Sequence, residues 1–209
     1  MASIVKSFSL SGINGYRVDV ETSLIQGKAS ISIIGLGDTA IKEAAERIRS
    51  ALSAYSFDYP QLKIIINLAP GDFKKRGSHY DLAMAVGLLQ ASNQIHCDNL
   101  SDFGFLGELS LTGNIRHCKG IIPMVLAAKE NSVKNIIIPY DNFPEVVGIE
   151  GVNIIPTKTI KEVVDLLEGK EIATDYKQLK SNYVSSTIDT YYEKDSDYSD
   201  VKSQSVPGT

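Results

Sequence analysis

Three residues that could together perform nucleophilic chemistry stand within four positions of one another, at Ser78, His79 and Asp81. They form a hydrolytic triad only when the serine and the carboxylate reach opposite nitrogens of the imidazole. The apolar spacing that follows predicts a helix from about Tyr80 to Ala91. Neighbouring residues at a helix start point about 100° apart, so Ser78 and His79 cannot face one another. We therefore expect no triad here.

The same residues have the spacing of a helix cap. In a capping box, the hydroxyl of Ser78 would bind the backbone N–H of Asp81, and the carboxylate of Asp81 would reach back to the first residue. Gly77 permits the unusual backbone angle that precedes such a cap. The spacing therefore predicts that Ser78 and Asp81 cap this helix.

Two short basic runs have the chemistry to contact nucleic-acid phosphates. The first directly precedes Gly77 and the second surrounds His117; the residues are Lys74, Lys75, Arg76, Arg116 and Lys119. Lysine and arginine neutralise phosphates and release counterions without recognising the base sequence. The alternatives are ordinary solvated loops or a subunit interface that faces acidic neighbours.

Each cysteine follows a histidine, which raises the question of a zinc site. The pairs His96–Cys97 and His117–Cys118 lack the short ligand spacings of a tetrahedral zinc site. Two cysteines also make no disulfide framework. We therefore expect that the chain binds no metal, that its thiols are reduced and that the protein is cytoplasmic. No G-x4-G-K-[ST] segment occurs, so the chain has no loop of that type for ATP phosphates.

The composition is typical of a globular protein with a slight excess of acidic groups. The 209 residues are 43% hydrophobic and carry a formal net charge of -4, which gives no global signal for nucleic-acid binding. No apolar run reaches the ~18 to 20 residues of a membrane span. The first residues also lack the apolar segment of a secretory signal. We expect no membrane partner.

The elements that must position these groups alternate between strands and helices. Apolar runs and period-two alternation predict strands near residues 4–10, 16–21, 29–34, 63–68 and 135–138, and a hairpin over 104–115. Helical spacing predicts helices over residues 38–52, 80–91, 121–129 and 160–168, the first with Asp38 as its N-cap. Strands paired by hairpins and mixed with helices favour an α+β fold over a doubly wound sheet.

The chain changes character near residue 170. Residues 171–209 are polar and rich in serine, tyrosine and aspartate, with few aliphatic side chains. Such a segment cannot bury much apolar surface. The composition therefore predicts one domain over residues 1–170 and a polar linker over residues 171–209.

Four segments resemble signatures of the magnesium-chelatase-like AAA+ ATPases of the YifB and ComM group. NLAPGDFKKRGS and YDLA, within residues 67–83, are similar to that family's NLAPADLKKEGSGFDLPIA. Residues 35–52 are similar to its GLPDxAVKESRERVRAAL, and residues 107–113 to its GELSLDG. Residues 197–204 are similar to DFxDVxGQ, which precedes the ATPase module. The resemblance runs from residue 1 to about 204, although Gly37 replaces a usual proline and Ser203 a usual glycine.

That resemblance implies a Lon-protease-like fold, a variant of the second domain of ribosomal protein S5. Lon proteases use a Ser-Lys dyad. Their segments PKDGPSAG and GGLKEKLLAA, laid on residues 75–79 and 119–128, place His79 at the nucleophile and Ile122 at the base. An isoleucine cannot accept a proton, so we expect no catalytic residue of this type. In such a fold, both basic runs would flank the degenerate site.

The resemblance further implies a function. The chain would be the non-catalytic N-terminal module of a hexameric AAA+ motor that processes DNA, by branch migration in natural transformation, and would serve in assembly or DNA contact. We expect no cofactor in the chain itself. The resemblance implies that ATP and Mg²⁺ would bind an AAA+ module, and the chain is expected to end before that module. The alternative is an enzyme, a Lon-like peptidase whose rearranged centre pairs Ser78 with Lys119 or with His79.

Overall fold

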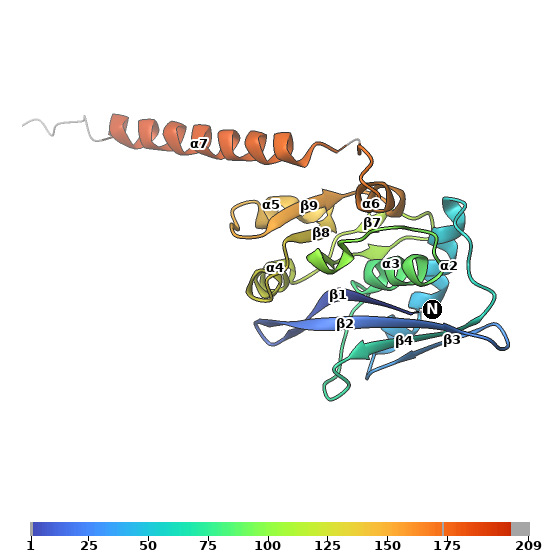
Figure 1. Ribbon diagram of the computed structural model, residues 1–209. Helices are drawn as coiled ribbons and strands as arrows, with labels where there is room; N and C mark the ends of the chain where they lie inside the picture. The colour runs from blue at the N-terminus through green and yellow to red at the C-terminus, as the bar shows by residue number, and fades with distance from the viewer. Residues whose placement is uncertain (1, 173, 202–209) are drawn as a thin grey trace, which may run out of the picture. The chain divides into compact units, whose positions relative to one another are not determined.

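The strands form a mixed sheet of seven in the order β3-β4-β2-β1-β5-β8-β9 (Figure 1). The computed structural model describes residues 2–172 and 174–201. Pairs β1–β2 and β2–β4 are antiparallel, and the other four pairs are parallel. The strands are β1 (Ala2–Ser11), β2 (Asn14–Ile25), β3 (Ser30–Ile34), β4 (Lys63–Ala69), β5 (Phe103–Phe105), β8 (Asn135–Pro139) and β9 (Asn153–Thr157). The predicted α+β class is confirmed.

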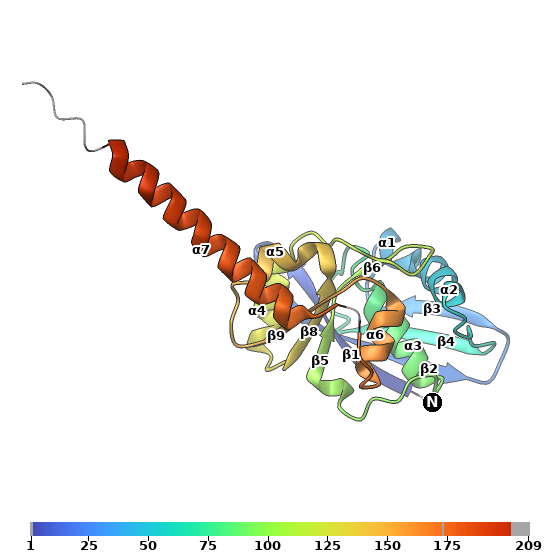
Figure 2. The same cartoon turned by 90° about the horizontal axis from the view of Figure 1, so that it is seen from above.

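The helices lie close to their predicted positions. They are α1 (Thr39–Lys42), α2 (Ala44–Ala54), α3 (Asp81–Ala91), α4 (Ile121–Glu130), α5 (Phe143–Val146) and α6 (Ile160–Leu167), with short 3-10 turns η1 (Leu100–Asp102) and η2 (Tyr140–Asn142). Asp38 caps α1 as predicted, because its Oδ1 accepts the N–H of Ile41 at 3.0 Å. The predicted helix over 38–52 is divided at Glu43, where α1 ends and α2 begins. In Figure 2, β8 and β9 lie beside α4 and α5, away from β3 and β4.

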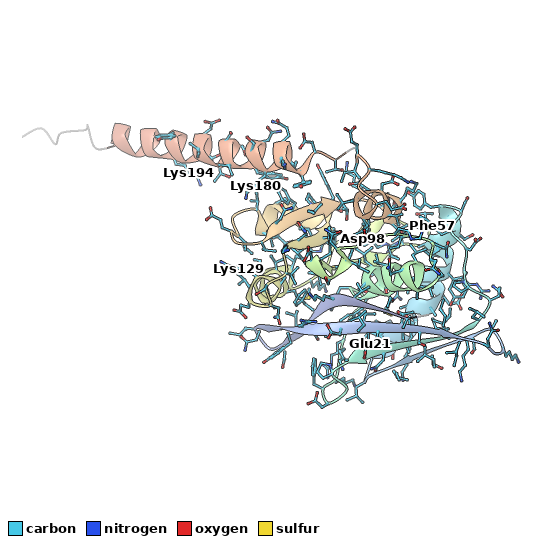
Figure 3. All side chains as sticks on the ribbon, viewed as in Figure 1. Glu21, Phe57, Asp98, Lys129, Lys180 and Lys194 are labelled. Carbon is cyan, nitrogen blue, oxygen red and sulfur yellow. The ribbon has the colours of Figure 1, made fainter. Side chains whose placement is uncertain are left out.

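The core lies between the sheet and the helix α3, in which every residue except Gln90 is buried. Alternate residues of β2, including Val18, Val20 and Leu24, are buried on the side that α3 and α4 cover. Glu21 lies on the opposite face of the same strand (Figure 3), where its Oε1 accepts a hydrogen bond of 2.7 Å from Asn67. One face of β2 is therefore packed and the other is polar.

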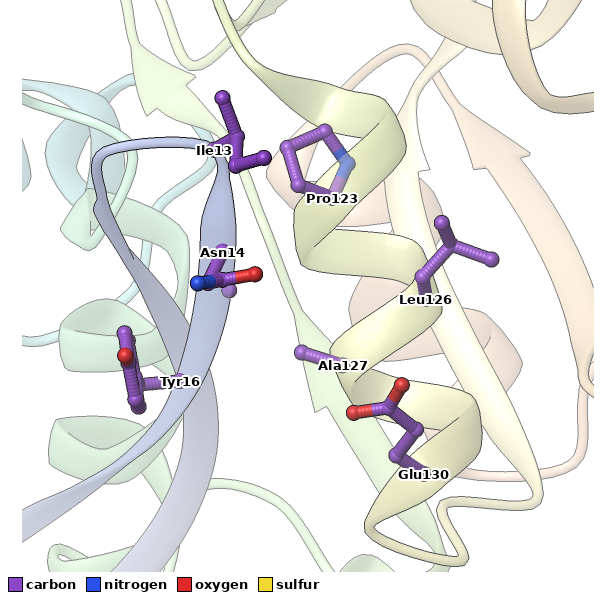
Figure 4. A pocket seen from close by; sticks show the side chains of 8 residues that line it. Ile13, Asn14, Tyr16, Pro123, Leu126, Ala127 and Glu130 are labelled. Carbon is purple, nitrogen blue, oxygen red and sulfur yellow. The ribbon is translucent and has the colours of Figure 1, made fainter.

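The β1–β2 turn meets α4 across a small hollow of about 270 Å³ (Figure 4). A Cβ added at Gly15 would lie 2.3 Å from the carbonyl oxygen of Pro123, so only glycine permits this approach. Ile13, at the tip of the turn, is 89% exposed. The hairpin and α4 therefore approach each other closely at Gly15 and Pro123.

A separate hairpin lies beside the sheet. It pairs β6 (Glu108–Leu109) with β7 (Ile115–Arg116), antiparallel, within the stretch predicted as a hairpin. The residues predicted to start that hairpin belong instead to β5 of the main sheet. The hairpin matters for function because it carries Glu108 and Arg116 toward the start of α3.

The chain divides into two units, residues 1–174 and 175–209. The stretch predicted as a polar linker contains the helix α7 (Tyr176–Val201), whose side chains at Val184 and Ile188 are exposed. The segment that resembles the sequence before an ATPase module, residues 197–204, extends beyond the described residues. Among the described helices, none has the length and apolarity required to span a membrane.

Candidate functional site

One pocket of about 400 Å³ brings together side chains from both basic runs and from the residues that precede α3. It lies between the loop before α3, the β6–β7 hairpin and the residues before α4. The polar residues that line it are Arg76, Ser78, His79, Glu108, His117 and Lys119. Leu10 and the buried Cys118 add apolar surface. The pocket therefore surrounds the position that the resemblance places at a Lon nucleophile.

Ser78 does not cap α3, and the predicted capping box is wrong. The helix begins at Asp81 after an N-cap at Tyr80 that makes no side-chain cap bond. Ser78 therefore lies before the N-cap, and its hydroxyl donates to Oε2 of Glu108 on β6. Its backbone carbonyl, in contrast, accepts the N–H of Asp81 at 3.2 Å.

Asp81 binds Arg47 of α2 in place of the predicted cap. Nε of Arg47 donates to Oδ2 at 2.6 Å, and a terminal nitrogen donates to Oδ1 at 3.0 Å. The backbone N–H of Leu109 donates to Oδ2 at 3.1 Å. Burial raises the pKa of Asp81 to about 6, against the opposing effect of the Arg47 hydrogen bond, and that bond raises the pKa of Arg47. The pair fixes α2, α3 and β6 to one another.

His79 is held as a neutral imidazole in the lining of the pocket. Its side chain is 9% exposed, and its Nε2 donates to the carbonyl oxygen of Phe8 at 2.7 Å. Because a carbonyl only accepts, Nε2 carries the proton and Nδ1 is a bare acceptor. Burial lowers the pKa of His79 to about 4. No described residue donates a hydrogen bond to Nδ1.

The two positions of the Lon dyad are not assembled for catalysis. Ile122 is 45% exposed and does not line the pocket that contains His79. Ser78 and Lys119 do share that pocket. In the part of the chain that the structure describes, however, the hydroxyl of Ser78 donates to Glu108 and not to Lys119 or His79.

Lys75 cannot contact DNA, which corrects one of the five predicted phosphate contacts. Its side chain is fully buried, and Nζ donates to the carbonyl oxygens of Gly35, at 2.8 Å, and of Pro70. Nζ also lies 4.6 Å from the centre of the Phe73 ring. Burial lowers the pKa of this lysine. Its charge therefore stabilises the loop instead of facing solvent.

The remaining basic residues face solvent. Lys74, Arg76, Arg116 and Lys119 are exposed. Arg116 lies 4.0 Å from Glu108, a weak surface pair,. Lys74, Arg76 and Lys119 form no ion pair with any described residue. Three unpaired cations therefore stand on or near the pocket.

The other ionisable groups beside the pocket are engaged in structure. His117 Nε2 lies 3.1 Å from Oε2 of Glu145, which also accepts from Asn142 at 2.7 Å. Burial raises the pKa of Cys118 to about 12, so its thiol stays protonated. Within the described residues, no three metal-ligating side chains come together.

The two signature segments hold the pocket's loop in place. The N–H of Lys75 donates to Leu36 at 2.9 Å, and the N–H of Asp38 donates to Lys75 at 3.1 Å. The N–H of Gly77 donates to Oδ2 of Asp38 at 3.1 Å. Gly77 has a φ of +98°, which favours glycine. Asp38 therefore both caps α1 and orients the loop that carries Arg76 and Ser78.

Sequence reasoning missed Arg47, Glu108 and Asp38 as partners in this site. Each lies in a segment that resembles a family signature, but the resemblance does not show which residues of different segments meet. A buried carboxylate at the start of an apolar helix is one usable signal, because such a group requires a cationic partner.

Comparison with known proteins identifies the family and agrees with the fold. The family model described as "Subunit ChlI of Mg-chelatase" matches residues 20–142, more than half of the chain. Competence protein ComM of Haemophilus influenzae is 38% identical over 169 residues, which cover 81% of this chain and 33% of ComM. YifB of Escherichia coli is 38% identical over 168 residues, with 80% and 33% covered.

Lon protease 2 of Bacillus subtilis is 30% identical over 180 residues, which cover 78% of this chain and 32% of that protein. This likeness agrees with a Lon-like fold. The chain spans about a third of the length of the curated relatives it matches. Through the family model and its ComM-like and YifB-like sequence, the chain belongs to the magnesium-chelatase-like ChlI family.

Proposed function

We propose that this chain is the non-catalytic N-terminal module of a YifB- or ComM-type AAA+ protein, and that it contacts DNA phosphates through the basic residues around the pocket. One observation carries the proposal. Arg76 and Lys119 come from distant parts of the sequence, line one pocket and are exposed, and no described carboxylate pairs with either. Convergent, unpaired cations are the groups that bind phosphates.

The role in the whole protein follows from the family. One relative is named a competence protein, which supports DNA processing, such as branch migration in natural transformation. In this proposal an AAA+ module binds ATP and Mg²⁺, the working assembly is a homohexamer in the cytoplasm, and the present module contributes assembly or DNA contact. The chain's formal net charge of -4 means that one module binds weakly, so several copies would act through avidity.

Fluorescence anisotropy with labelled single- and double-stranded oligonucleotides tests the DNA contact. We expect binding at low salt that weakens as salt rises. The triple variant Lys74→Ala, Arg76→Ala and Lys119→Ala should flatten the slope of log K against log salt by up to ~3 units for duplex DNA, about one per lost contact. All base sequences should be affected about equally.

A matched control removes three lysines elsewhere on the surface, Lys28, Lys63 and Lys129, which are all exposed. Lys129 lies in the last turn of α4 (Figure 3), whereas Lys119 precedes the first turn of that ten-residue helix. We expect the control to keep most of the slope. If neither oligonucleotide binds at about 50 mM salt, or if both triple variants behave alike, the DNA contact is wrong. The module would then serve in assembly.

The peptidase alternative has one observation in its favour, since Ser78 and Lys119 line the same pocket. A fluorophosphonate, which traps activated serines, tests it directly. We expect no labelling, because the Ser78 hydroxyl donates to Glu108 and the dyad positions hold His79 and Ile122. Labelling that is lost in Ser78→Ala would establish the peptidase instead.

A further inference from the structure

We propose that the pocket binds the phosphorylated end of a single DNA strand, so that the module recognises strand ends more tightly than internal backbone. This inference rests on the proposed function and specifies its ligand. The ligand class is a phosphate monoester followed by phosphodiesters. The argument depends on the pocket's size, on its charge and on one acceptor in its lining.

The shape excludes the middle of a duplex. The pocket has a volume of about 400 Å³, within the range of small-ligand pockets, and the buried imidazole of His79 is part of its lining. Duplex phosphates lie on the outside of a convex rod. They can reach exposed residues at the rim, such as Arg76 and Lys119, but not His79. A strand end is narrow enough to enter.

The charge favours a terminal phosphate over an internal one. A phosphate monoester carries about -1.5 to -2 charges at neutral pH, whereas a diester carries one. Arg76 and Lys119 line the pocket from two sides. Lys119 lies two residues before Ile121, the first residue of the ten-residue helix α4.

The lining of the pocket includes an acceptor that requires a donor. Nδ1 of His79 lacks a proton, because Nε2 donates to Phe8,. Nδ1 lies beside Gly77, which also lines the pocket. Ser78 donates to Glu108, so toward a ligand its oxygen also accepts. An internal diester has no O–H to offer. A monoester has two forms near neutral pH, since its second pKa is about 6. The dianion has the extra charge for Arg76 and Lys119, and the monoanion has in its place a P–O–H that can donate to Nδ1.

The surroundings favour nucleic acid over a peptide carboxylate, which would also suit two cations. Lys74 and Arg116 are exposed in the same two basic runs, beyond the residues that line the pocket. A strand has further phosphates for these residues, whereas the backbone of a peptide carries no repeating charge. Glu108 also lines the pocket, but its carboxylate accepts from Ser78 and lies near Arg116, which offsets its repulsion.

The test compares oligothymidines that carry a 5′-phosphate, a 3′-phosphate or only hydroxyl ends, each labelled at the other end, by anisotropy at one salt concentration. We expect one phosphorylated form to bind roughly tenfold more tightly than the hydroxyl form, as extra charge-assisted hydrogen bonds imply. Lys119→Ala and Arg76→Ala, both at exposed positions, should abolish that preference, and the control Lys28→Ala should keep it.

His79→Gln tests the acceptor in the lining, because glutamine can still donate to Phe8 but alters the acceptor that faces the ligand. We expect it to reduce the preference for phosphorylated ends while binding of hydroxyl-ended strands stays unchanged. If this variant fails to fold by circular dichroism, the variants of Lys119 and Arg76 decide the question alone.

The outcomes separate this inference from the proposed function. Equal binding of phosphorylated and hydroxyl-ended strands overturns the strand-end site and leaves DNA contact standing. Displacement of the phosphorylated strand by equimolar thymidine monophosphate or inorganic phosphate shows a free-phosphate site and overturns it too. Displacement of the phosphorylated strand by an equimolar peptide with a free carboxyl terminus would also overturn the strand-end site. Failure of every strand to bind at low salt overturns both proposals.

Discussion

The guanidinium of Arg47 binds the buried carboxylate of Asp81 through two hydrogen bonds, of 2.6 and 3.0 Å. The same guanidinium donates to the carbonyl of Ala40 at 2.6 Å, and the carboxylate accepts from the N–H of Leu109. Segments from two different family signatures are therefore joined by one ion pair. The pair fixes the start of α3, on which the pocket depends.

Removing one partner of this pair should lower the free energy of unfolding far more than removing both. Arg47→Met leaves the fully buried Asp81 without its cation, which we expect to cost about 3 kcal/mol of unfolding free energy. The double variant Arg47→Met with Asp81→Leu should recover much of that loss, because no buried charge remains. Urea denaturation of the two single variants and the double variant measures the coupling. Additive losses would contradict the assignment.

A similar cycle tests the role of Ser78. Ser78→Ala removes a partly buried hydrogen bond to Glu108, so we expect a loss of about 1 kcal/mol in the free energy of unfolding. In a Glu108→Ala background the same substitution should cost almost nothing, because the acceptor is already gone. A helix cap would be lost equally in both backgrounds. Equal losses in the two backgrounds would therefore support the capping-box interpretation.

Local patterns predict much of the fold because they depend on residues close in sequence. The apolar spacing of α3 and α4 indicates their positions within one or two residues. Asp38 is recognisable as a cap because its side chain needs only the N–H three residues later. The α+β class follows from the mixture of hairpins and helices, and the resemblance adds the Lon-like fold.

The predictions that the structure contradicts, for Ser78 and Lys75, depend on contacts between distant segments. Whether Ser78 caps a helix depends on where the helix begins and on Glu108, which arrives from another hairpin. Lys75 belongs to a basic run that resembles a solvated loop. Its burial depends on Gly35, forty residues earlier, because two loops pair there. The periodicity of one segment does not indicate which distant segment it contacts.

The contrast between Lys74 and Lys75 makes a direct prediction. Lys75→Ala removes the donor to the carbonyls of Gly35 and Pro70 and leaves a cavity, so we expect a loss of roughly 2 kcal/mol or more. Lys74→Ala alters an exposed position and should change stability by less than about 0.5 kcal/mol. Thermal or urea denaturation compares them. Equal losses of stability in the two variants would mean that Lys75 faces solvent, and Lys75 would again be a candidate phosphate contact.

The buried His79 should make stability depend on pH. Its pKa falls from 6.5 in the unfolded chain to about 4 in the folded protein. Between these values the unfolded chain binds a proton that the folded protein does not, so stability rises with pH. The contribution is complete above pH 6.5 and is lost as the pH falls toward 4. We expect a loss of roughly 2 to 3 kcal/mol over this window.

Asp81 acts in the opposite direction over part of that range. Burial raises its pKa from 3.8 to about 6, so its contribution is present at low pH and is lost as the pH rises. A comparison of the wild type with His79→Gln isolates the histidine, because Asp81 and the exposed His96 and His117 are common to both proteins. Urea denaturation from pH 4 to 7 should show a shallower rise of stability with pH in the variant. Parallel curves would mean that the pKa of His79 is the same in the folded and unfolded states, so that burial would not keep the imidazole neutral below pH 6.5.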